Sequence, residues 1–154
     1  MSTSSAPRSA AGGGTAIRAG RLWAGGVATA CVAALVAVVG VLLFGSVLDV
    51  ELVQPPLLLT PSDSVVVNYA LTAFVAALLA TGVAHLLSAT TPRPRLFFGW
   101  IVGLATVAAM VVAFAAAADT AGKVCSATVA LAVGIAIGSL LTGVLSRTVY
   151  RTGG

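Results

Sequence analysis

Four long runs of apolar residues divide the chain, and short polar or proline-containing segments separate them. Each run holds the roughly 20 residues that an α-helix needs to cross the hydrocarbon core of a bilayer. Because a backbone in lipid must satisfy its own hydrogen bonds, we expect every run to be helical. The predicted helices cover about residues 22–48, 65–87, 96–118 and 124–145. The pattern therefore predicts an all-α fold, an integral membrane antiparallel four-helix bundle.

The segments at the two ends lack this pattern. Residues 1–20 are rich in Ser, Ala and Gly without apolar periodicity, a composition that cannot offset the entropy of ordering, so we expect a disordered cytoplasmic tail. The first apolar run is much longer than the 7–15 apolar residues of a secretory signal, so we interpret it as a retained anchor. These observations predict a transmembrane domain over residues 21–148 and a short cytoplasmic tail over residues 149–154.

The connections between the runs differ in length. Two prolines in Thr91–Arg95 cannot continue a helix, so we expect the second and third helices to form a tight hairpin. Asp119–Lys123, which contains a glycine, predicts an equally short turn. Residues 49–64 are then the longest loop, and Ser62–Ser64 supplies good helix N-cap residues at its end.

Charge indicates how the bundle lies in the membrane. Only 8% of the residues are charged, and the net charge is +4. If the termini lie on the same side as the proline turn, that side carries seven arginines and no acid: Arg8, Arg18, Arg21, Arg93, Arg95, Arg147 and Arg151. The other side carries Lys123 with four acids: Asp49, Glu51, Asp63 and Asp119. The positive-inside rule therefore predicts a multi-pass protein of the cell membrane with both termini cytoplasmic. The basic residues form no aromatic-interleaved patch, so we expect no nucleic-acid partner.

Four polar side chains in or near the runs are candidate functional residues. His85 lies close to the cytoplasmic end of the second run, where a proton or ligand role competes with a simple interfacial position. Asn68 and Tyr69, near the outer end of that run, could line a shallow polar pocket with Asp63. The alternative is that these residues are interfacial anchors and neighbours of a helix cap.

Small residues predict where the helices pack. The fourth run repeats them at every fourth position: Ala130, Gly134, Gly138, Thr142 and Ser146. The third run contains Gly99 and Gly103, followed by Ala105, Ala109, Ala113 and Ala117, and the second run contains Thr72, Ala76, Ala80, Ala84 and Ser88. Such stripes let helix backbones approach closely in lipid. We expect contacts within one bundle, with a homo-oligomer interface as the alternative, and we expect Ile135 and Ile137 to point away from this contact.

Catalytic chemistry finds little support in the sequence. It holds no Cys-x-x-Cys, no phosphate-binding glycine loop, no metal-ligand cluster and a single histidine. Cys31 and Cys125 differ in depth by about 20 Å at 1.5 Å per helical residue, too far for a disulfide. We therefore expect a noncatalytic protein without cofactor or metal, an accessory or scaffold subunit with the bilayer and a membrane protein or a second copy as partners. The alternative is a small transporter or channel.

The layout as a whole resembles a known family. The features that carry this resemblance are the Asp49-Val50-Glu51 loop, Pro92-Arg93-Pro94-Arg95, Phe114-Ala115-Ala116 and the glycine-striped fourth run. Over about residues 22–147 they are similar to an uncharacterised family of small four-helix membrane proteins of high-GC bacteria, a domain of unknown function. The resemblance implies a four-helix membrane fold and assigns no activity and no functional residues.

Overall fold

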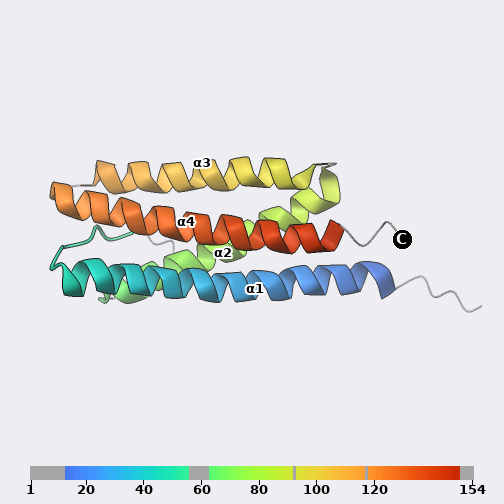
Figure 1. Cartoon of the computed structure of the whole chain (residues 1–154), viewed down its shortest axis with the longest axis horizontal. Helices are drawn as coiled ribbons and strands as arrows, with labels where there is room; N and C mark the ends of the chain where they lie inside the picture. The colour runs from blue at the N-terminus through green and yellow to red at the C-terminus, as the bar shows by residue number, and fades with distance from the viewer. Residues whose placement is uncertain (1–12, 56–62, 92, 117, 150–154) are drawn as a thin grey trace, which may run out of the picture.

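The protein consists of four long helices in the part of the chain that the computed structural model describes, which is residues 13–55, 63–91, 93–116 and 118–149. The helices are α1 (Gly13–Val41), α2 (Val65–Thr90), α3 (Pro94–Ala115) and α4 (Thr120–Val149), and α1 continues as a π-helical segment, η1 (Leu42–Val47) (Figure 1). Each of the four is long and apolar enough to cross a membrane. The prediction of an all-α fold with four candidate spans is therefore confirmed.

The first helix begins earlier than the apolar pattern indicates. Residues 13–20 belong to α1, although their composition predicts part of a disordered tail. Once a helix exists, each added residue gains a hydrogen bond without a new nucleation cost, so a neighbouring segment of moderate propensity can extend it. Residues 1–12 of the predicted tail, and residues 150–154 of the predicted C-terminal tail, lie outside the described residues. Val149 is the last residue of α4.

The connection between the third and fourth helices is short, as predicted, but it lies earlier than Asp119–Lys123, because α3 ends at Ala115 and α4 begins at Thr120. Asp119 precedes that helix, and its side-chain Oδ1 accepts a hydrogen bond from the N–H of Gly122 at 3.1 Å. This is the bond that an N-cap aspartate makes to one of the unpaired N–H groups of a first turn. Ser64 occupies the corresponding position before α2 in extended conformation without such a side-chain cap bond, and Pro94 opens α3, where its missing N–H costs nothing.

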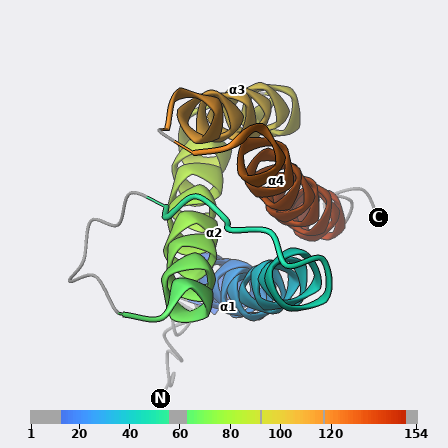
Figure 2. The same cartoon turned by 90° about the vertical axis from the view of Figure 1, so that its left-hand side faces the viewer.

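The helices form two closely packed pairs, α1 with α2 and α3 with α4, and a third extensive contact joins α1 to α4 (Figure 2). Helices α2 and α3 meet at their connecting turn but make few contacts elsewhere. The hairpin predicted for these two helices is therefore tight at the turn only, because α2 follows α1 while α3 follows α4. Figure 1 shows α2 crossing behind α4 toward the start of α3.

Alanine is the most frequent residue of the core. The fully or almost fully buried members of the core are Leu22, Ala30, Ala33 and Ala37 of α1, Ala73, Ala77 and Ala84 of α2, and Phe98, Ile137, Leu141 and Leu145 of α3 and α4. Gly26 lies directly against the side chain of Thr81, so the backbones of α1 and α2 are close at this point. The buried hydroxyl of Thr81 donates to the carbonyl of Ala77 at 2.8 Å, which leaves the interface without an unpaired polar group there.

Candidate functional site

The two polar residues predicted at the outer end of the second helix both contact the loop before it. Asn68 is buried, and its Nδ2 donates to Oε1 of Gln54 at 2.9 Å. The Tyr69 hydroxyl donates to the carbonyl oxygen of Val53 at 2.6 Å. The first turn of α2 thus holds two consecutive residues of the loop.

The same stretch of loop is also held by α4. The backbone N–H of Val53 donates to Oγ of Ser126 at 2.9 Å, and the neighbouring Leu52 is buried in a small cluster with Val41 and Val129. We call residues 52–55 the strap. Because its hydrogen bonds reach both α2 and α4, the strap links two helices that make few direct contacts with each other.

Gly122 permits the close passage of the chain just before the strap. A Cβ atom at this position would overlap the carbonyl oxygen of Glu51 and lie 2.8 Å from Oδ1 of Asp119. The glycine therefore lets the loop pass against the first turn of α4 without displacing the residue that caps the helix.

The other two candidate residues lie apart from this cluster. Asp63 is exposed ahead of α2 and does not line the cavity described below. His85 is exposed near the far end of α2, where its backbone carbonyl accepts a hydrogen bond from the hydroxyl of Ser88. The structure therefore brings Asn68 and Tyr69 together with the strap but does not join Asp63 or His85 to them.

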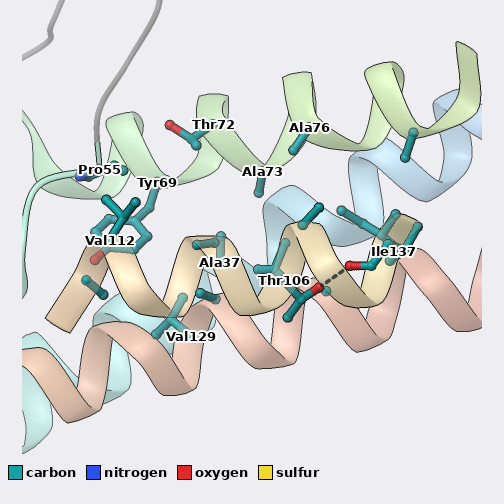
Figure 3. Close-up of a pocket in the computed structure, with 18 of the residues that line it drawn as sticks. Ala37, Pro55, Tyr69, Thr72, Ala73, Ala76, Thr106, Val112, Val129 and Ile137 are labelled. Carbon is teal, nitrogen blue, oxygen red and sulfur yellow. Dashed lines mark hydrogen bonds between the residues drawn. The ribbon is translucent and has the colours of Figure 1, made fainter. Parts of the chain in front are cut away.

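Beneath the strap lies a cavity of about 470 Å³ between α2, α3 and α4 (Figure 3). Its walls come from one face each of three helices, with Ala37 of α1 behind them and Val53–Pro55 of the strap at one end. The α2 wall contains Tyr69, Thr72, Ala73, Ala76, Leu79, Ala80 and Val83; the α3 wall Phe98, Ile101, Val102, Ala105, Thr106, Ala109, Val112 and Ala113; the α4 wall Ser126, Val129, Ala130, Val133, Gly134 and Ile137.

The polar side chains of this lining are few, and their hydrogen bonds turn back to the protein. Thr72 donates to the carbonyl of Asn68 at 2.7 Å, and Thr106 donates to the carbonyl of Val102 at 2.8 Å, the dashed line in Figure 3. Every buried side-chain nitrogen or oxygen of the described residues has a partner. The inner surface is therefore hydrocarbon in character and suits an apolar occupant.

The small-residue stripes divide between packing and this cavity. Gly134 lies directly against the side chain of Thr106, whereas a Cβ atom at Gly138 would lie at an ordinary contact distance, 3.5 Å, from the side chain of Val102. The contact predicted at Gly99 and Gly103 is not found, because a Cβ atom at either would meet nothing within 4 Å. Both glycines are exposed on α3.

The remaining stripes of α2 and α3 face each other across the cavity instead of packing together. Ala76 and Ala80 stand on one wall, and Ala105 and Ala109 on the other. On α4, Ile137 is buried in the core, contrary to the expectation that it points away, whereas Ile135 is exposed. The buried face of α4 is thus rotated from the predicted stripe toward its larger residues.

Sequence reasoning missed the strap and its partner Ser126. The available signal was weak: Leu52 and Val53 form an apolar pair two residues before Pro55, but the loop also contains Val50 and the apolar run Leu57–Leu59. A hydrogen bond such as Val53–Ser126, between residues 73 positions apart, leaves no local mark in the sequence.

The part of the chain that the structure describes contains neither a metal-binding cluster nor a disulfide. It contains no cluster of three or more His, Cys, Asp or Glu side chains that could hold a metal. Cys31 and Cys125 are both free thiols.

Comparison with protein families identifies a match over most of the chain. A family described as a family of unknown function, DUF6069, matches residues 17–147. No curated protein and no solved structure matches the chain.

Proposed function

The chain belongs to this family of unknown function, and from its geometry we propose that it is a noncatalytic integral membrane protein that serves as an accessory or scaffold subunit. In this proposal the helices cross the cell membrane of a bacterium as an antiparallel bundle. Both termini and the Thr91–Arg93 turn lie in the cytoplasm, and the strap lies at the outer surface.

The observation that carries the proposal is the outward face of the helices. Large apolar side chains project from all four candidate spans, among them Leu35, Leu79, Leu104 and Ile135, each more than 60% exposed. The core beneath them is built mainly of alanine. Soluble monomers rarely expose contiguous apolar surface on this scale. A lipid environment accounts for this inverted distribution of side-chain size.

Charge supports the orientation. Arg93 and Arg95 are exposed at the α2–α3 turn, while Asp49, Glu51 and Asp63 are exposed at the opposite ends of the helices. Arginine is enriched in cytoplasmic loops, which favours the α2–α3 turn as a cytoplasmic segment.

Cysteine labelling in intact cells tests this topology. In a background with Cys31 and Cys125 replaced by alanine, Glu51→Cys and Arg93→Cys form a matched pair, because both native side chains are exposed. A membrane-impermeant maleimide should label Glu51→Cys in intact cells and Arg93→Cys only after lysis. The reverse pattern would overturn the orientation, and labelling of both positions in intact cells would overturn the membrane-spanning arrangement.

The accessory role predicts a stoichiometric membrane partner and no solute flux by the chain alone. Purification from native membranes in mild detergent should recover that partner, and proteoliposomes of the isolated protein should match empty vesicles in ion and proton flux.

The rival is a small transporter or channel, for which the cavity is the relevant feature. Ion paths are lined by carbonyls or charged groups, whereas this cavity is lined mainly by Ala and Val. A pH-dependent flux that His85→Ala abolishes would favour the rival.

A further inference from the structure

We propose that the cavity between α2, α3 and α4 binds one hydrocarbon chain of a membrane lipid, which enters sideways from the bilayer. The inference rests on the proposed insertion into a membrane and adds a specific binding site to it. Four properties carry it: the chemistry of the lining, the shape of the cavity, its closed end and its open side.

The lining selects for hydrocarbon. Of its 25 residues, only Gln54, Tyr69, Thr72, Thr106 and Ser126 are polar, and the hydroxyls of Tyr69, Thr72 and Thr106 donate to backbone carbonyls. A polar ligand in these walls would lose its hydrogen bonds to water and find few replacements. An apolar chain loses none, and it supplies the dispersion contacts that an empty cavity forfeits.

The shape selects for a single chain. Along α2 the lining extends from Tyr69 to Val83, about 20 Å at 1.5 Å per residue. A volume of about 470 Å³ is thus spread along most of one helix rather than gathered in a compact chamber. This elongated shape suits one extended hydrocarbon chain.

The end of the cavity nearest the polar loop is closed by the strap. Val53–Pro55 form that end, and the bonds from Tyr69 and to Ser126 fix Val53 in place. This closure separates the apolar interior from the aqueous side of the loop. A ligand therefore does not enter the cavity from water at this end.

The long side of the cavity faces outward between α2 and α3. Ala76 and Leu79 on one wall and Ala105, Ala109 and Val112 on the other line the cavity and are also exposed. By contrast, the floor residues Ala73 and Ile137 are each only 5% exposed. In a bilayer the medium at this opening consists of lipid chains, and only a chain that enters the cavity can reach the floor.

Photolabelling distinguishes the floor of the cavity from the outer surface of the helices. The full-length protein is reconstituted in phosphatidylcholine vesicles whose lipid carries a diazirine on one acyl chain, and labelled peptides are mapped after irradiation. We expect adducts on Ala73 and Ile137 as well as on the outward-facing Leu104. Adducts on Leu104 with none on the floor would overturn the proposal, whereas the absence of adducts at all of these positions would overturn the membrane insertion on which it rests.

Two neighbouring alanines of α3 provide a matched pair of variants. Both are exposed, but Ala109 lines the cavity and Ala108 does not. Ala109→Phe should abolish floor labelling, while Ala108→Phe should retain it, and both should retain labelling of Leu104, which shows that the variant is inserted. Ala76→Leu fills the cavity from the opposite wall and should repeat the loss if Ala109→Phe does not fold. Floor labelling that survives either cavity-filling variant in its inserted form would overturn the proposed site.

Discussion

The hydroxyl of Tyr69 donates a 2.6 Å hydrogen bond to the carbonyl oxygen of Val53, and this bond fixes the strap across the end of the apolar cavity. Tyr69 is itself half-buried. Its ring therefore forms part of the cavity wall while its polar atom holds the wall's closing segment. One residue thus couples the order of the loop to the shape of the interior.

Replacing this tyrosine by phenylalanine tests the coupling. Tyr69→Phe keeps the ring but leaves the Val53 carbonyl without its donor, which should lower the free energy of unfolding by about 1–3 kcal/mol. Thermal unfolding in detergent measures the loss, and hydrogen exchange of peptides covering residues 50–55 should become faster. Ser88→Ala is the control, because it removes an exposed hydroxyl that makes a 2.7 Å bond. Equal stability of the two variants would show that the strap does not depend on Tyr69.

The number and approximate extent of the helices could be predicted because the constraint on them is local. A backbone in lipid must pair its polar groups within the same segment, so each long apolar run implies a helix. The ends were less predictable: Gly13 and Thr120 begin helices in stretches without a strong apolar signal.

Which face of each helix packs could not be predicted, since these helices are apolar on every side. Amphipathicity marks a buried face only where the other face is polar. On α2, Ala73 and Ala77 are buried, whereas Ala76 is exposed and Ala80 is partly exposed, and the two pairs have the same residue types and spacing. The cavity arises from how helix pairs diverge, which no single helix records.

Glycine substitutions in α3 and α4 distinguish a helix face that packs from one that does not. Gly134→Ala places a Cβ atom against the branched side chain of Thr106, which has no flexible end to move away, so we expect a loss of about 1–3 kcal/mol from overpacking. Gly99→Ala adds the same methyl group in open space and should be neutral or gain up to about 1 kcal/mol from helix propensity. Thermal unfolding in detergent compares the two. If the two variants unfolded alike, the α3–α4 contact at Gly134 would be looser than the structure indicates.

The two isoleucines of α4 report the rotation of that helix. Ile137 is 5% exposed and Ile135 is 62% exposed. Ile137→Val removes a buried methyl group and should cost about 0.5–1.5 kcal/mol, whereas Ile135→Val removes a methyl group that faces the surroundings and should change stability by less. Denaturation midpoints of the two variants decide between this arrangement and the sequence-based expectation that both side chains point away from the core. A larger cost at Ile135 would reverse the rotation described here.

The final prediction concerns Gly122, where the loop before the strap passes over the first turn of α4. A methyl group there overlaps the carbonyl oxygen of Glu51 and crowds Oδ1 of Asp119. Because backbone cannot rotate away as a side-chain end can, Gly122→Ala should displace the loop, weaken the helix cap and loosen the bond from Val53 to Ser126. Losing the cap alone costs about 0.5–2 kcal/mol.

Gly143→Ala is the matched control, because a Cβ atom on this other α4 glycine meets nothing within 4 Å. We expect Gly122→Ala to unfold at lower temperature and to exchange the Val53 amide faster, with neither change in Gly143→Ala. Asp119→Ala separates the two contributions, since it removes the cap bond and leaves the space beside Glu51 intact. Faster exchange of the Val53 amide in Gly122→Ala but not in Asp119→Ala would assign the effect to the displaced loop. Equal exchange in both would assign it to the helix cap and contradict a role for Gly122 in seating the strap.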